Sequence, residues 1–267
     1  MFLYQIIILS IIQGLTEFLP ISSSGHLILM PHFLAWKDQG HLMDVAVHVG
    51  TLGSVLIYFW KDVLSMITGF FQLLRGKVTK GGQLFILLCI GTVPAVIFGL
   101  FLKRYGVSHL RSVALIGWTM TGYAIVMYIA DRFSPDVKKG GDITGPKAFW
   151  VGVAQALALI PGTSRSGACI TMMRFFGFER AEAARFSFLL AIPAITAAAS
   201  LTAYDAIKAG AFSSVYKDAS IAALLAFVAG IVAINFMLRW LRQRDLTPFV
   251  VYRLGLGGFL LYWAYYL

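Results

Sequence analysis

Long apolar blocks separated by short polar loops run along the whole 267-residue chain. A helix needs ~20 mostly apolar residues to cross a bilayer. Six blocks are long enough, or nearly so, to cross as helices: 45–60, 84–102, 113–130, 187–204, 219–240 and 248–267. We therefore predict one all-α integral membrane domain over residues 1–267, with six transmembrane helices.

Two further apolar regions, 2–36 and 148–178, are each interrupted by a polar segment. The first break is Pro20-Ile21-Ser22-Ser23-Ser24-Gly25-His26, and the second is Pro161-Gly162-Thr163-Ser164-Arg165-Ser166-Gly167. Irregular backbone at membrane depth is tolerated only inside protein or beside a water-filled cavity. We therefore predict two re-entrant helical hairpins, whose second helices, 27–36 and 168–178, begin at or just after the breaks.

The two breaks resemble each other when the sequence is shifted by 142 positions. This shift aligns Gln13 with Gln155, Ser22 with Ser164, Ser24 with Ser166, and Gly25 with Gly167. The offset predicts two repeats, of about residues 1–135 and 143–267, each with one hairpin and three spans. Because three is odd, the second repeat enters the membrane from the opposite face. Such inverted-topology repeats place their interrupted helices near the midplane.

Composition and charge also favour an integral membrane protein. The chain is 59% hydrophobic and only 13% charged, which excludes a soluble enzyme with one membrane anchor. Its net charge of +10 comes without a basic, aromatic-rich run, so we expect no nucleic-acid partner. The predicted topology puts fourteen Lys and Arg residues on one side and six on the other, namely Lys37, Lys103, Arg104, Arg111, Lys208 and Lys217. Basic loops are cytoplasmic, so the first hairpin should open to the outer face.

Glu17 is the strongest single candidate for a functional residue, because it alone among twelve acidic residues lies inside an apolar block. A charged residue at the centre of a membrane helix costs roughly 2.5–3.5 kcal/mol, so it is a functional candidate by default. The alternative is a structural acid that is hydrogen-bonded to the hairpin. Gln13 lies four residues earlier, on the same helix face.

The first break carries an anion-binding pattern. Ser22, Ser23, Ser24 and Gly25 are typical of the cap and first turn of a helix, whose free N–H groups and positive dipole suit a phosphate. Serines are also common ordinary caps. His26 is a candidate general acid or metal ligand, although a lone histidine is more often simply buried and hydrogen-bonded.

Arg165 is the charged residue of the second break. Its guanidinium offers paired donors that match phosphate oxygens. The alternative is an ion pair with Glu17 across the repeat interface, and both can hold in an empty site. His48, Thr51 and Ser54 recur at helical spacing and either line the cavity or serve helix packing.

Together these residues favour phosphoryl transfer, which needs an oriented nucleophile and positive groups near the phosphate oxygens. The rival is a transporter or lipid-phosphate flippase, since inverted repeats with interrupted helices are transporter architecture. Transport does not require a serine and a histidine beside Glu17, so this pair separates the two hypotheses.

Residues 13–26 (Gln-Gly-Leu-Thr-Glu-Phe-Leu-Pro-Ile-Ser-Ser-Ser-Gly-His) and 161–168 (Pro-Gly-Thr-Ser-Arg-Ser-Gly-Ala) resemble the two signature motifs of the undecaprenyl-pyrophosphate phosphatase family, of the bacitracin-resistance type. The resemblance spans the full length. It implies a multi-pass enzyme of the bacterial inner membrane, and the loop charges above predict that its site opens to the periplasmic face. The enzyme would convert undecaprenyl pyrophosphate to undecaprenyl phosphate, the lipid carrier of cell-wall synthesis.

The resemblance also implies roles for the motif residues. Glu17 matches the essential acid and metal ligand, Ser23 the proposed nucleophile, His26 the catalytic histidine and Arg165 the pyrophosphate clamp. The residues expected to bind substrate are Gln13, Ser22, Ser24, Gly25, Thr163, Ser164, Ser166 and Gly167. The implied cofactor is a divalent cation, Mg²⁺ or Ca²⁺, and the implied partner is a polyprenyl pyrophosphate lipid.

The sequence departs from the commonest form of the motif at two positions. Gln13 stands where many members of the family carry a second glutamate, and Ser24 where many carry threonine. Whether Ser23 or a water attacks phosphorus stays open. The oligomeric state also stays open, with a homodimer as one candidate.

Overall fold

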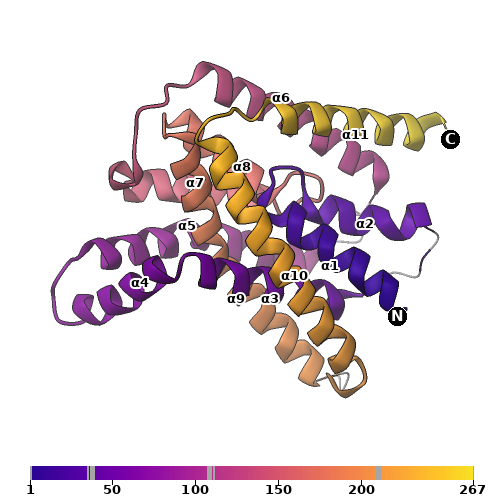
Figure 1. Cartoon of the computed structure of the whole chain (residues 1–267), viewed down its shortest axis with the longest axis horizontal. Coiled ribbons are helices and arrows are strands. Elements are labelled where there is room, and N and C mark those ends of the chain that lie inside the picture. Colours follow the sequence, from indigo (N-terminus) through magenta and orange to yellow (C-terminus); the bar gives the residue numbers. More distant parts are fainter. Residues whose placement is uncertain are drawn as a thin grey trace.

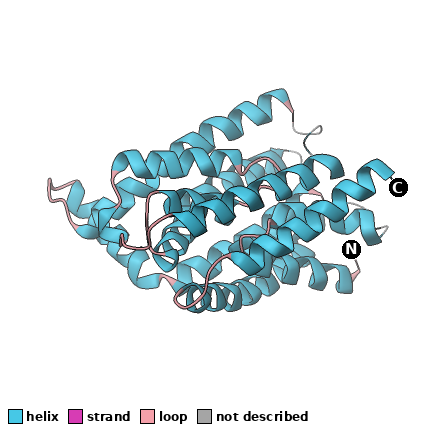
Figure 2. Ribbon diagram, turned by 90° about the horizontal axis from the view of Figure 1, so that it is seen from above, coloured by secondary structure: helices cyan, strands magenta, loops and turns pink. Residues whose placement is uncertain are grey.

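The computed structural model describes residues 2–34, 36, 40–106, 110, 112–208 and 212–266. These residues form eleven α-helices and one short 3₁₀ helix: α1 (Leu3–Phe18), α2 (Ser23–Leu34), α3 (His41–Tyr58), α4 (Trp60–Leu73), α5 (Lys80–Tyr105), α6 (Val113–Phe133), η2 (Gly140–Asp142), α7 (Gly145–Leu157), α8 (Arg165–Phe175), α9 (Arg180–Lys208), α10 (Phe212–Leu241) and α11 (Thr247–Tyr266). The described part of the chain contains no strand beyond an isolated bridge between Lys138 and Phe178. The all-α prediction is therefore confirmed (Figures 1 and 2).

Four of the described helices are long and apolar enough to cross a membrane: α5, α6, and the segments Arg180–Thr202 of α9 and Lys217–Leu241 of α10. The bent pair α3 and α4 makes a fifth if it counts as one span. Helix α11, the predicted sixth span, is not among them and carries the buried Arg253. The chain is thus a membrane protein with several apolar helices, and the count of six stays a prediction.

The first predicted span does not run straight on from residue 45 to 60. Helix α3 ends at Tyr58, and after Phe59 the chain turns by 84° into α4. Helix α4 was not predicted, because its apolar positions are mixed with polar ones and many of its large side chains are exposed. Asp62 in the first turn of α4 accepts a hydrogen bond from Arg185 of α9, which fixes the new direction.

The two short helices begin inside their polar breaks, earlier than predicted. Helix α2 starts at Ser23 and α8 at Arg165, four and three residues before the expected starts at 27 and 168. The serine side chains explain the difference, because a capping hydroxyl satisfies the free N–H groups of the first turn. Ser23, Ser24 and Gly25 therefore lie in the first turn of α2, as their capping pattern predicted, and only the predicted starting positions were too late.

Close approaches between helix backbones hold the bundle together. An added Cβ at Gly50 of α3 would collide with the carbonyl of Ala223 in α10, and one at Gly152 of α7 with the carbonyl of Gly91 in α5. Small residues at helix interfaces allow such approaches in membrane proteins. Helices α1, α3 and α10 pack on one another, and α6 packs along α11 (Figure 1).

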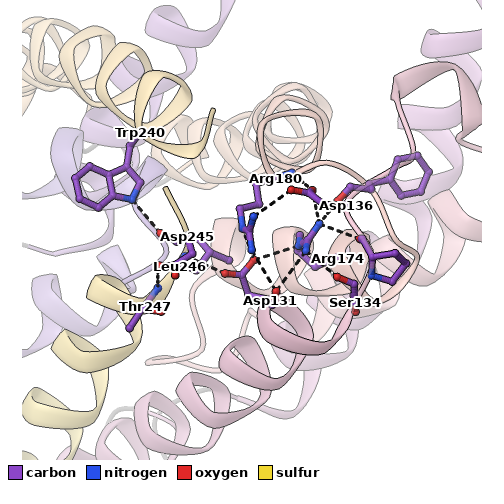
Figure 3. Close-up of polar contacts among 11 residues, drawn as sticks. Asp131, Ser134, Asp136, Arg174, Arg180, Trp240, Asp245, Leu246 and Thr247 are labelled. Atoms are coloured by element: carbon purple, nitrogen blue, oxygen red, sulfur yellow. Dashed lines mark hydrogen bonds and ion pairs between the residues drawn. The ribbon is translucent and has the colours of Figure 1, made fainter. Parts of the chain in front are cut away.

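A second buried carboxylate, that of Asp131, lies at the end of α6. From the sequence, only Glu17 was identified as an acid inside an apolar block. Asp131 is 6% exposed and accepts hydrogen bonds from Arg174 Nε (3.1 Å), Arg180 Nε (2.7 Å) and the Leu246 N–H (2.9 Å) (Figure 3). Arg174, which is fully buried, also pairs with Asp136 at 2.7 Å. This network ties α6, α8, α9 and α11 together at one end of the bundle.

We predict that Asp131→Asn lowers the free energy of unfolding by about 3 kcal/mol, because it removes the charge that compensates two arginines in a buried site. Thermal or denaturant unfolding of the purified protein in detergent measures the loss. The control is Asp136→Asn, whose side chain is 44% exposed and whose removal should cost no more than about 1 kcal/mol. Equal effects of the two substitutions would contradict the central place of Asp131.

Candidate active site

The first break forms a sharp turn between α1 and α2. Glu17 lies in the last turn of α1, and Ser22 adopts a positive φ of 75° just before α2 begins. The Ser22 hydroxyl accepts a hydrogen bond from the N–H of Gly25 (3.3 Å) and thereby caps the helix. A non-glycine residue in the left-handed region is strained and is often found at functional sites.

The second break repeats this conformation 142 residues later. Ser164 has a φ of 74°, and its hydroxyl accepts from the N–H of Gly167 (3.1 Å) at the start of α8. Ser164 Oγ lies 3.3 Å from Ser166 Oγ, as Ser22 Oγ lies 3.4 Å from Ser24 Oγ. Both breaks therefore present a serine-capped helix N-terminus with the same local geometry.

Glu17 and Arg165 join the two breaks in a buried ion pair. Arg165 donates from Nη2 (3.1 Å) and Nε (3.3 Å) to Glu17 Oε1, and the glutamate is only 5% exposed. Arg165 also donates from Nη1 to the carbonyl of Ser187 in α9 at 3.0 Å. The ion pair with Glu17, which was one of the two roles predicted for Arg165 from the sequence, is therefore present.

The other carboxylate oxygen of Glu17 collects donors from its own hairpin. Oε2 accepts from the Ser23 hydroxyl (2.7 Å) and from the Gln13 amide (2.9 Å). Ser23 is half-buried, while Gln13 is fully buried and its Oε1 has no hydrogen-bond partner. A serine hydroxyl that donates to a carboxylate is poised to lose its proton to that carboxylate.

His48 of α3 is the imidazole next to this carboxylate. Its Nε2 lies 3.6 Å from Glu17 Oε2, and its side chain is 30% exposed. Nδ1 lies 2.6 Å from the carbonyl oxygen of Asp44. Because a carbonyl can only accept, Nδ1 holds a proton in this contact, and Nε2 faces the glutamate. From the sequence, His48 was predicted only to line the cavity or to serve helix packing.

His26, the predicted catalytic histidine, points elsewhere in this conformation. Its Nδ1 contacts the carbonyl of Ser22 (2.6 Å), and its Nε2 contacts the hydroxyl of Tyr252 in α11 (2.6 Å). Within the described part of the chain, no hydrogen bond or ion pair joins His26 to Glu17 or Ser23. Its catalytic role stays a prediction from the motif.

The remaining motif residues lie at the contact between the two breaks. A Cβ added to Gly25 would lie 3.6 Å from Gly162 Cα, and one added to Gly167 would lie 3.4 Å from Pro20 Cβ. Ser166 donates to the carbonyl of Leu19 (3.1 Å). Thr163 is buried, and its hydroxyl has no hydrogen-bond partner.

Arg253 of α11 is a site-supporting residue that sequence reasoning missed. It is 1% exposed and donates to the carbonyls of Pro20 (3.2 Å), Gly162 (3.0 Å) and Met120 (3.3 Å). It thus holds one carbonyl of each break. The signal was present in the sequence, since an arginine inside an apolar block is a functional candidate by default.

Comparison with known proteins assigns the chain to a family. Residues 6–259 match the family model described as "Bacitracin resistance protein BacA". The chain belongs to the BacA family. Its relatives include proteins named undecaprenyl-diphosphatase from Jannaschia sp. (48% identical, covering 99% of this chain and 100% of the relative), Dinoroseobacter shibae (48%, 99% and 100%) and Roseobacter denitrificans (47%, 99% and 100%). The BacA family resemblance seen in the two motifs is thereby confirmed.

Proposed function

We propose that this chain hydrolyses undecaprenyl pyrophosphate to undecaprenyl phosphate and inorganic phosphate, for reuse of the cell-wall lipid carrier. The observation that carries the proposal is the shared carboxylate of Glu17, which binds the arginine of one break and the serine hydroxyl of the other. Full-length relatives named undecaprenyl-diphosphatase support the same reaction. Their names do not support the transporter or flippase alternative.

In the proposed reaction, the substrate pyrophosphate lies between Arg165 and the N-terminal turns of α2 and α8. The guanidinium and the free N–H groups stabilise charge on the phosphate oxygens. Ser23 Oγ attacks the terminal phosphorus while Glu17 Oε2 takes its proton, and the bridging P–O bond breaks to release the lipid monophosphate. Water then hydrolyses the phosphoserine. If water attacks directly instead, Glu17 takes the proton from that water.

Two histidines are candidates to exchange protons during this cycle. His48 lies beside Glu17 and is partly exposed, so it can pass a proton between the carboxylate and the cavity. His26 is the histidine of the family motif, and Tyr252 holds its Nε2. A change of ring orientation would release His26 toward the substrate.

A divalent cation, Mg²⁺ or Ca²⁺, is part of the proposal. No group of three His, Cys, Asp or Glu side chains among the described residues would cage a metal. Mg²⁺ usually binds one or two carboxylates together with substrate phosphates, which fits a site with Glu17 and the unpartnered Oε1 of Gln13. When bound, the ion neutralises charge on the phosphate oxygens.

We further propose that the two halves of the chain are inverted-topology repeats of about residues 1–135 and 143–267, with six spans and two re-entrant hairpins. The matched φ angles of Ser22 and Ser164 support this arrangement. So do the contacts of Gly25 with Gly162 and of Gly167 with Pro20, because the 142-residue shift exchanges one contact for the other. Arg253 would lie near the pseudo-twofold, where it binds the equivalent carbonyls of Pro20 and Gly162.

We predict that Ser23→Ala separates the two attack mechanisms. Phosphate release from undecaprenyl pyrophosphate by purified protein should be readily measurable for the wild type. If Ser23 is the nucleophile, the variant should lose at least about a thousandfold in kcat, as expected for removal of a covalent nucleophile. Residual hydrolysis within about tenfold of the wild type would assign the attack to water. A wild-type protein that releases no phosphate would contradict the proposed function itself.

The excess of basic residues on one side predicts that the site opens to the outer face of the cytoplasmic membrane. Ser24→Cys, made in a Cys89→Ser background because Cys89 is exposed, should react with a membrane-impermeant thiol reagent in cells whose outer barrier has been opened. Gln243→Cys, on the side predicted to be cytoplasmic, is the matched control and should react only after the inner membrane is disrupted. The reverse pattern would contradict the proposed orientation.

A further inference from the structure

A groove of about 400 Å³ lies beside the active site, between α5, α7 and α9. Its walls are mostly apolar and built from small or aliphatic side chains, and it reaches Arg165. Helix α9 contributes Ala194, Ala197, Ala198 and Leu201, which recur at helical spacing on one face. Helix α5 contributes Ala95, Val96, Gly99 and Leu100 on the facing wall.

The polar groups of this groove are few and mostly used within the protein. Thr92 donates to the carbonyl of Leu88 (2.7 Å), and the Gln155 amide donates to the carbonyl of Gly91 (3.4 Å). Arg165 is the charged residue of the lining. The groove is therefore mostly apolar with one charged side chain in its lining, which matches an amphiphile with an anionic head and a hydrocarbon tail.

Arg165 connects the groove to the proposed reaction site. The same side chain donates to Glu17 Oε1 (3.1 Å) and to the carbonyl of Ser187 (3.0 Å) while it lines the groove. A pyrophosphate held by this guanidinium would have its tail beside the apolar lining of the groove. The head group and the tail would then bind in one continuous site.

We propose that this α5/α7/α9 groove binds the first isoprene units of the lipid substrate, and that Gly99 and Ala197 set how well it accepts them. The inference rests on the proposed function. A volume of about 400 Å³ is near the lower end for small-molecule sites. It is too small for the whole undecaprenyl chain, so the distal units lie in the bilayer and the groove reads only the proximal ones.

Gly99→Phe tests the groove with little disturbance of the fold. A Cβ at Gly99 would meet only the Leu159 side chain, at 3.6 Å, so the new ring would extend into the groove. Ala197→Phe fills the groove from the opposite wall and serves as the second variant. The matched control is Ile97→Phe, because Ile97 lies on the same helix, is 63% exposed and does not line the groove.

The measurement compares kcat/KM for farnesyl diphosphate, with three isoprene units, and methyl diphosphate, which has none. Each groove variant should lose on the order of tenfold or more on farnesyl diphosphate, the scale of a lost apolar subsite contact. Its activity on methyl diphosphate should stay within about twofold of the wild type, because this substrate has no tail to enter the groove, and Ile97→Phe should leave both values unchanged.

Three outcomes would overturn the groove assignment while the proposed function stands: equal loss on both substrates, no loss on either, or the same loss in Ile97→Phe. A wild-type protein inactive on every polyprenyl diphosphate would contradict the proposed function instead. The two failures are therefore distinguishable.

Discussion

The ion pair between Glu17 and Arg165 is the constraint on which the rest of the site depends. A carboxylate that is only 5% exposed in an apolar helix needs a compensating charge, and this one receives it from a residue 148 positions away. The pair brings the two breaks together and leaves the second oxygen of Glu17 free to accept the Ser23 proton. One contact thus serves both folding and the proposed chemistry.

Arg253 stabilises the contact between the two breaks through hydrogen bonds to their backbone. The two breaks leave backbone carbonyls without helical partners, and unpaired backbone groups are costly when they are buried. Arg253 donates to the carbonyls of Pro20 and Gly162, which are equivalent under the 142-residue shift. A single side chain therefore satisfies both breaks and fixes their separation, so that the serine-capped ends of α2 and α8 flank Glu17.

Much of this could be predicted from the sequence, because hydropathy and helix breakers act locally. The apolar blocks, the two breaks and the choice of Glu17 and Arg165 as candidate residues follow from hydropathy and the cost of burying charge. The bend after Tyr58 could not be predicted, since the contact that ties α4 to α9 joins Asp62 to Arg185, 123 positions away. The buried network of Asp131 and the orientation of His26 toward Tyr252 also depend on tertiary contacts. A charged residue's partner is rarely visible in its neighbouring sequence.

The most direct test of the account is Glu17→Gln, assayed both for phosphate release and for binding of undecaprenyl pyrophosphate. An amide cannot take the proton of the attacking group, and Gln13 beside it is already an amide. Arg165 would lose its partner but keep its charge for the pyrophosphate. The account predicts that phosphate release falls by at least about a thousandfold, while the purified variant still binds the substrate. Substantial phosphate release by Glu17→Gln at any divalent-ion concentration would contradict it.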